Sequence, residues 1–152
     1  MCVFWGGGGV SLAKMYFSKV PEMLKRSKSR LNVEVKTLMM IDSLEMTESD
    51  INKIIKECKY SKSKRIVITH GTDTMVNTAS KIAKKINDKT IVLTGAMIPY
   101  AFGSSSDGFF NLGSALSFVQ TLEKGIYIAM NGQYFKYNNV IKDKEKGYFK
   151  SL

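Results

Sequence analysis

The chain has 152 residues, about the length of one domain, which excludes two domains of ordinary size. Its hydrophobic share of 44% and aromatic share of 11% are typical of folded proteins and argue against disorder. No apolar run approaches the roughly 20 residues of a membrane-spanning helix, so we expect no membrane partner. Cys2 and Cys58 cannot form a disulfide framework, and we interpret them as reduced thiols of a cytoplasmic protein.

The chain is strongly basic, with 23 Lys and Arg against 13 Asp and Glu, for a formal net charge of +10. Such a charge raises the hypothesis of a nucleic-acid partner. The positive residues are mostly lysines spread along the chain, however, and no aromatic–basic motif of a single-strand binding module occurs. We therefore favour a solvated basic surface over a nucleic-acid site. The single histidine, His70, cannot build a metal centre alone, and we expect no metal and no cofactor.

The first half of the chain predicts alternating strands and helices. An apolar run at 1–5 predicts a first buried strand, which stops at four glycines, 6–9. A weak helical pattern covers 20–28, and the sequence VEVKTLMMI at 33–41 predicts a strand. Thr47 has the position of a helix cap, with Asp50 near the helix N-terminus, and an apolar helical face follows over 51–58.

The second half continues the same alternation. Strands are predicted at 65–69, 90–94 and 126–130, with amphipathic helices at 75–86 and 107–122 between them. Continuously apolar strands separated by such helices indicate a mainly parallel sheet covered on both faces. The predicted fold is therefore α/β, a three-layer, doubly wound single domain over 1–152.

In such sheets the ligand lies beyond the carboxyl ends of the strands. Polar residues and glycines gather at these ends: the glycine run, Asp42 and Ser43, the segment 70–74, the segment 95–97, and Asn131 onward. The glycine run fits either a close backbone approach to a ligand or a tight strand-to-helix turn, and it is neither a Walker loop nor a clean dinucleotide-binding fingerprint. The clustering predicts a binding site at this edge.

Thr72 and Asp73 have two interpretations. A threonine hydroxyl becomes a nucleophile only when a neighbouring base takes its proton, and an acid with a lysine partner could supply that base. The alternative is that Thr72, Asp73 and Thr74 cap the following helix. The residues themselves leave both interpretations open.

Several motifs, in order along the chain, resemble the L-asparaginase/glutaminase family of bacterial-type threonine amidohydrolases. The string HGTDTM at 70–75 is that family's signature, and LTGAM at 93–97 followed by Pro99 resembles its V-G-A-M-x-P segment. Matches of the same kind come from 41–46, from SDG with NL at 106–112, and from FKS at 149–151, which in the family closes the N-terminal domain. The resemblance implies the family's N-terminal fold, with the family's C-terminal domain absent.

The resemblance also implies roles for individual residues. Thr72 would be the second catalytic threonine and Asp73 its acidic neighbour, which in the family also holds the amino group of the substrate. Lys142, placed by counting from Met130 and Asn131, would complete a Thr–Asp–Lys group. The resemblance also implies positions that bind two parts of the substrate. Ser43 and the backbone near Gly71 would bind its carboxylate, and the carbonyl of Ala96 would bind its side-chain amide.

The chain departs from the family pattern in its first segment. The family's primary nucleophile is a threonine in a Gly-Gly-Thr motif, and here that position falls on Gly8 or Gly9. Ser11 could substitute only if the turn were rebuilt, and Tyr16 is the only nearby residue for the family's catalytic tyrosine. Removing a primary nucleophile typically costs several orders of magnitude in rate.

Two functions therefore remain open. One is a minimal amidohydrolase that converts L-asparagine and water to L-aspartate and ammonia through Thr72, Asp73 and Lys142. The other is a catalytically inactive asparaginase-like domain that binds an amino acid, such as L-asparagine or L-aspartate, or a partner chain. Aromatic residues near the end, at 134–137 and 148–149, could cover surface by self-association as a homo-oligomer or pack on the chain's own core.

Overall fold

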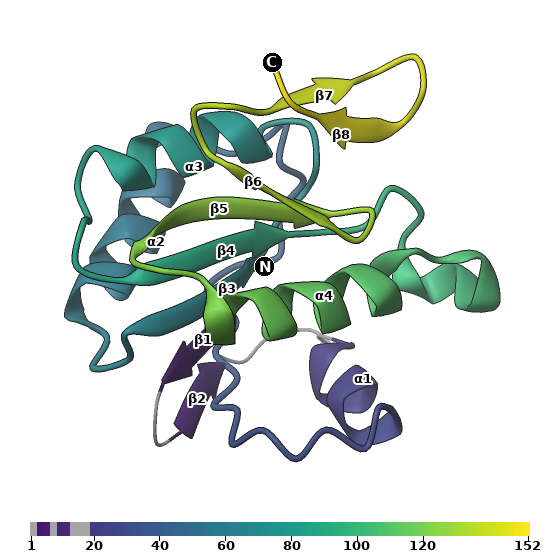
Figure 1. The fold of residues 1–152 in the computed structure, drawn as a ribbon, viewed down its shortest axis with the longest axis horizontal. Coiled ribbons are helices and arrows are strands. Elements are labelled where there is room, and N and C mark those ends of the chain that lie inside the picture. Colours follow the sequence, from purple (N-terminus) through teal and green to yellow (C-terminus); the bar gives the residue numbers. More distant parts are fainter. Residues whose placement is uncertain (1–2, 7–8, 13–18) are drawn as a thin grey trace.

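The computed structural model describes residues 3–6, 9–12 and 19–152 (Figure 1). Six strands form one sheet in the order β2-β1-β3-β4-β5-β6. The three central strands β3, β4 and β5 are parallel, whereas β1 pairs antiparallel with β2 and β3, and β6 pairs antiparallel with β5. The strand bounds are β1 Val3–Gly6, β2 Gly9–Leu12, β3 Arg65–Thr69, β4 Thr90–Thr94, β5 Gly125–Met130 and β6 Gln133–Lys136.

Helices cover both faces of the sheet. Along β3, Ile66 and Ile68 pack into a core with α2 and α3, while Val67 points to the opposite core with α1 and α4. This alternation follows from the two-residue period of a strand, with apolar residues in both positions because both faces are buried. The helix bounds are α1 Val20–Arg26, α2 Glu48–Tyr60, α3 Met75–Ala83 and α4 Gly108–Thr121, with a short 3₁₀ helix η1 at Tyr100–Ser105. The predicted three-layer α/β fold is confirmed.

The start of α2 agrees with the prediction in detail. Thr47 is the N-cap, its hydroxyl accepts the backbone N–H of Asp50, and the Asp50 carboxylate accepts the backbone N–H of Thr47. This reciprocal pair satisfies two N–H groups that a helix start leaves open. Ile51, Ile54 and Cys58 are buried on the inner face of the helix.

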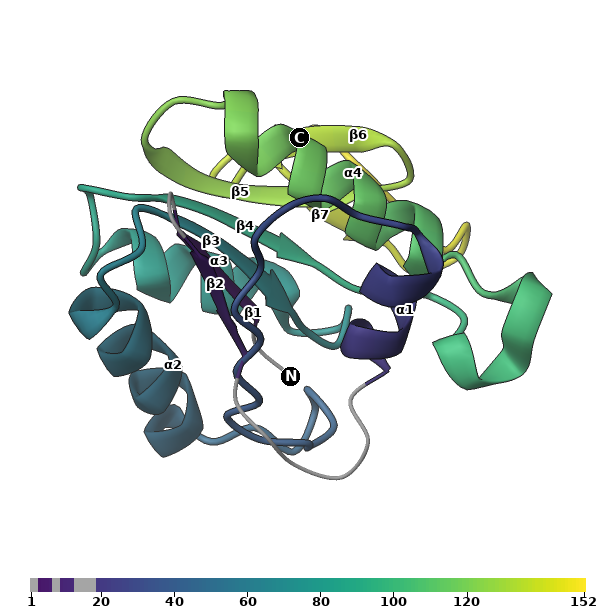
Figure 2. The same ribbon diagram turned by 90° about the horizontal axis from the view of Figure 1, so that it is seen from below.

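The strand predicted at 33–41 is wrong. The segment has no regular secondary structure, although several of its apolar side chains pack against the core. Val33 and Val35 pack against the core on the α4 side, whereas Leu38 and Met39 pack against the core on the α3 side. The segment therefore crosses from one face to the other instead of joining the sheet, and the edge of β3 is taken by β1 (Figure 2).

The glycine run differs from its predicted turn. Gly6 ends β1 and pairs with Gly9 at the start of β2, so the run joins strand to strand and not strand to helix. The predicted first strand at 1–5 agrees with β1 over residues 3–5, while β1 continues to Gly6, and residues 1–2 lie outside the described part of the chain.

The C-terminal segment forms a separate two-stranded sheet, β7 Ile141–Asp143 with β8 Tyr148–Lys150. Phe149 of this hairpin and Phe135 of β6 are buried in the core on the α3 side, so these two aromatics pack on the chain's own core. Tyr134 remains 49% exposed. Among the described residues, no helix has the length and apolar character needed to cross a membrane.

Candidate active site

The carboxyl ends of the central strands form the expected edge. β3, β4 and β5 end at Thr69, Thr94 and Met130. The backbone N–H of His70 donates to the carbonyl of Thr94 at 2.8 Å, which extends the pairing of β3 and β4 beyond the last strand residue. The Thr94 hydroxyl donates to the carbonyl of Ala129 at 2.7 Å and ties β4 to β5. The loops that follow these strands are thereby held in register.

Thr72, Asp73 and Lys142 meet at this edge. The Lys142 Nζ donates to Thr72 Oγ1 at 2.8 Å and to Asp73 Oδ1 at 2.8 Å. Thr72 is 8% exposed, and the Lys142 side chain is 12% exposed although it ends in a charge. A buried ammonium group requires a charge partner and hydrogen bonds, and this one has both. A contact across 70 positions of sequence thus joins the three predicted catalytic residues.

The capping alternative for this segment finds no support in the geometry. Thr74 is the N-cap residue of α3, yet no side-chain hydrogen bond caps that helix. The Thr74 hydroxyl donates instead to the carbonyl of Ser43 at 2.9 Å. Thr72 and Asp73 both bond to Lys142 and leave the helix start uncapped by side chains.

Ser43 lies directly against Gly71. A Cβ placed on Gly71 would come within 2.5 Å of Ser43 Oγ, so only glycine allows this approach. Ser43 is 3% exposed, and its carbonyl is fixed by the Thr74 hydroxyl. The loop before α2 is therefore locked onto the loop after β3, and two of the three predicted substrate-binding positions are adjacent.

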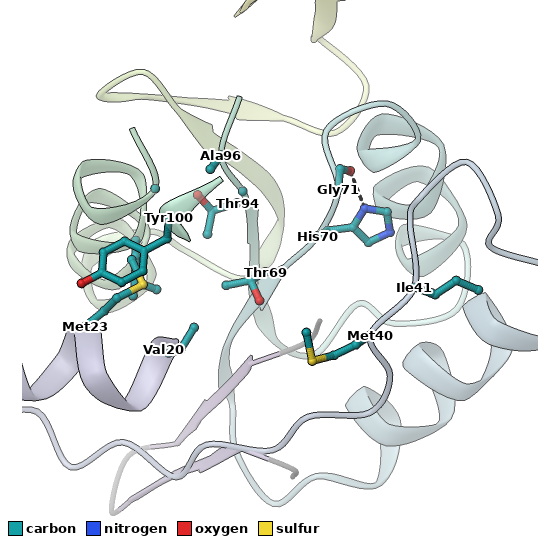
Figure 3. A pocket seen from close by; sticks show the side chains of 13 residues that line it. Val20, Met23, Met40, Ile41, Thr69, His70, Gly71, Thr94, Ala96 and Tyr100 are labelled. Carbon is teal, nitrogen blue, oxygen red and sulfur yellow. Dashed lines mark hydrogen bonds between the residues drawn. The ribbon is translucent and has the colours of Figure 1, made fainter. Parts of the chain in front are cut away.

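A cavity of about 260 Å³ adjoins this edge and is lined by Gly71 and by the third predicted binding residue, Ala96 (Figure 3). Val20 and Met23 of α1 and Met40 of the 33–41 segment give it a mainly apolar wall. Thr72, Asp73 and Lys142 are not among its lining residues. The structure therefore places the predicted site residues in two adjoining groups, the Thr–Asp–Lys contact and the cavity lined by Gly71 and Ala96. Ser43 lies against Gly71 but does not line the cavity.

His70 lines the same cavity and is 5% exposed. Its Nδ1 lies 2.7 Å from the carbonyl of Gly71, which can only accept, so Nδ1 carries the proton and Nε2 carries the lone pair. Burial lowers the pKa of His70 to about 4, against the opposing effect of the Gly71 carbonyl. The imidazole is therefore neutral at pH 7, and its Nε2 is buried with no hydrogen-bond partner among the described residues.

Sequence reasoning missed the function of Asp107 and Asn111. The two Asp107 carboxylate oxygens accept the backbone N–H groups of Met97 and Ile98, at 3.1 and 3.0 Å. The Asn111 side-chain amide donates to the carbonyl of Gly95 at 3.0 Å. Both side chains belong to the SDG–NL motif, so the motif was visible, but its action on the Gly95–Ile98 backbone requires three-dimensional contact.

The positions at which the first segment departs from the family pattern lie partly outside the described residues. Gly8 and Tyr16 lie outside the described residues, while Gly9 and Ser11 are described only as backbone of β2, where Ser11 pairs with Phe4. Within 3–6, 9–12 and 19–152, no three His, Cys, Asp or Glu side chains gather as a metal site would require.

Residues 7–148 match the family model described as "Asparaginase, N-terminal". The chain belongs to the asparaginase family. The match contains every predicted site residue, from Ser43 to Lys142, and agrees with the resemblance seen in the motifs. The family assignment and the α/β fold are thus established together.

Known relatives give the same result. The chain is 30% identical over 151 residues to L-asparaginase 2 of Escherichia coli K12, covering 90% of this chain and 42% of that protein. It is 34% identical over 131 residues to a probable periplasmic L-asparaginase of Haemophilus influenzae, covering 81% and 36%. The solved L-asparaginase of Thermococcus kodakarensis superimposes with a TM-score of 0.79 at 26% identity, covering 95% of this chain and 49% of that one. The chain thus spans less than half the length of these relatives.

Proposed function

We propose that this asparaginase-like chain hydrolyses the side-chain amide of L-asparagine, giving L-aspartate and ammonia. The observation that carries the proposal is the bridge of Lys142 Nζ between the Thr72 hydroxyl and the Asp73 carboxylate. Hydroxyl, amine and carboxylate in hydrogen-bond contact are the nucleophile, base and orienting group that acyl transfer requires. The three L-asparaginases that the chain resembles support the choice of substrate.

The chemistry proceeds in two steps. As the base, Lys142 Nζ takes the Thr72 proton while Oγ1 attacks the amide carbon. It passes that proton to the departing nitrogen as the C–N bond breaks, so the nitrogen leaves as ammonia. Water then cleaves the resulting ester, which frees L-aspartate and restores the hydroxyl. Asp73 holds the lysine in place, and the positions assigned to the substrate are Ser43 and the Gly71 backbone for its carboxylate and the Ala96 carbonyl for its amide.

The test is ammonia release from L-asparagine by the wild type, Thr72→Ala and Lys142→Met. Loss of a nucleophile lowers the rate by several orders of magnitude, so Thr72→Ala abolishes measurable turnover. Thr121→Ala, at the exposed end of α4, is the matched control and keeps the wild-type rate. Equal turnover in the wild type and Thr72→Ala would refute the catalytic role.

A second function is favoured by the glycine at the position of the family's first nucleophile, Gly8 or Gly9. In that case the chain binds L-aspartate or L-asparagine without turnover. A ligand at 100 times its Kd stabilises the folded state by about 2.7 kcal/mol, a measurable rise in melting temperature. Wild type without turnover but with this rise supports binding alone; no rise at millimolar ligand contradicts it.

Self-association and a cytoplasmic location stay predictions. Tyr134 of the predicted segment, which is 49% exposed, and Phe110, which is 61% exposed, are two of the exposed aromatics that a homo-oligomer would cover. Sedimentation equilibrium of the wild type and of Phe110→Ser tests this: a dimer or larger species that dissociates in the variant supports the prediction.

A further inference from the structure

Asn131 lies in the turn between β5 and β6, with a backbone φ of 56°. This left-handed conformation is uncommon for residues other than glycine, and asparagine is among those that tolerate it best. The turn brings Asn131 between two parts of the candidate site. Its backbone faces Asn111 on one side, and its side chain faces the β7–β8 hairpin on the other.

Asn111 fixes Asn131 to the segment that contains Ala96. It is completely buried, and each polar atom of its side-chain amide is used. Its Oδ1 accepts the backbone N–H of Asn131 at 2.9 Å, and its Nδ2 donates to the carbonyl of Gly95 at 3.0 Å and to Asp107 Oδ2 at 2.8 Å. A buried amide with all its partners present holds these elements in one arrangement, because any shift leaves a polar group unpaired.

The other side of Asn131 reaches the strand opposite Lys142. Its Oδ1 accepts the backbone N–H of Phe149 at 3.4 Å, and Phe149 is the residue that pairs directly with Lys142 in the hairpin. Paired residues of antiparallel strands point their side chains to the same face, which here is the face that buries Phe149. Asn131 therefore acts on the backbone immediately next to the residue that holds Thr72 and Asp73.

The hairpin requires such a tie. Among the described strands, β7 and β8 pair only with each other, and an isolated two-stranded hairpin is marginally stable in water. The contacts that dock it include the bonds of Lys142, the buried Phe149 ring and the bond to Asn131. Burial of the Phe149 ring holds the hairpin against the core but does not fix its orientation, because apolar packing is not directional. A hydrogen bond to the backbone of β8 is directional and therefore fixes it.

We propose that Asn131 is a positioning residue: through β8 it places Lys142 Nζ against Thr72 and Asp73, and through Asn111 it keeps this group in register with the Ala96 segment. The catalytic consequence rests on the proposed hydrolysis, but the positioning itself does not. Misplacement of a catalytic group by about 1 Å can cost on the order of 100-fold in rate.

The test compares Asn131→Gly with Asn131→Asp. Glycine keeps the left-handed backbone and removes the side-chain acceptor, while aspartate keeps an oxygen for the Phe149 N–H. Asn138→Gly, in the exposed turn between β6 and β7, is the matched control. The first readout needs no turnover: the NMR signals of the Lys142 side chain in lysine-labelled protein, assigned with Lys142→Arg.

We expect Asn131→Gly to shift the Lys142 signals and to speed amide exchange of Phe149 by tenfold or more. In Asn131→Asp, both the Lys142 signals and the exchange rate should stay close to those of the wild type. If the wild type turns over L-asparagine, kcat falls 10- to 100-fold in Asn131→Gly with little change in KM. Unshifted Lys142 signals in Asn131→Gly, or equal shifts in the glycine and aspartate variants, would overturn the positioning role. Failure of the proposed hydrolysis shows separately, as absent turnover with the Lys142 shifts still present.

Discussion

Protonation of His70 should destabilise the folded chain in mild acid. Burial lowers the pKa of His70 from 6.5 to about 4 in the folded state, so the unfolded chain binds the proton more readily. The stabilising effect of the neutral ring is complete above pH 6.5, falls with pH below that value, and levels off below about pH 4. Stability falls with falling pH because the folded chain buries the ring in its neutral form, beside the Gly71 carbonyl.

The size of the effect follows from the two pKa values. Each unit of difference is worth about 1.4 kcal/mol, so the full loss is about 3 kcal/mol, and lowering the pH from 8 to 5 costs about 2 kcal/mol. Carboxyl groups with lowered pKa, such as Asp50 and Asp88, lose their contributions below their ordinary value of 3.8, outside this window. His70 is the only histidine in the sequence, so a loss of stability between pH 8 and pH 5 can be assigned to it.

The assay is urea unfolding followed by circular dichroism at pH 8, 6.5, 5.5 and 5, for the wild type and His70→Asn. The asparagine amide can donate to the Gly71 carbonyl but does not titrate. We expect the free energy of unfolding to fall by about 2 kcal/mol more in the wild type than in the variant between pH 8 and pH 5. An equal fall in the two proteins would refute the assignment of a neutral, buried imidazole.

Two further substitutions, each with a control, test the packing: Gly95 lies at the site edge of the sheet, and Lys89 lies at the opposite end of β4. Gly95→Ala should lower the free energy of unfolding by about 1–3 kcal/mol, because the new Cβ would lie 2.3 Å from the carbonyl oxygen of His70. Gly113→Ala, on the open face of α4, is the control and should be neutral or stabilising in the same urea unfolding assay. Lys89→Met should cost about 1–3 kcal/mol in free energy of unfolding, because Lys89 is 2% exposed and its amine donates to the carbonyls of Ser61 and Ser63. Lys64→Met removes only a surface ion pair with Asp88 and should cost less than about 1 kcal/mol; equal losses in the two lysine variants would contradict the argument for Lys89.

The sequence predicted elements whose signals are local. The apolar runs of the central strands, the Thr47–Asp50 cap and the position of Thr72 after a strand each depend on neighbouring residues, and each agrees with the structure. The segment 33–41 misled because its apolar residues are shared between two cores, which gives strand-like composition without a strand. Long-range features, such as the α1 wall of the cavity and the Asn131 link, have no local pattern.

The two proposed functions depend on different parts of the molecule. Gly71 and Ala96 lie in the loops just after β3 and β4. These two strands are paired along their length and buried, so they hold both loops firmly at this edge. Lys142 comes from a hairpin outside that sheet and reaches Thr72 only when the hairpin is docked. Undocking the hairpin would therefore remove the base while leaving the cavity, its glycine approach to Ser43 and its neutral His70 in place. The two proposed functions thus depend on different elements of the fold, and we expect a variant that weakens the hairpin to lose turnover before it loses ligand.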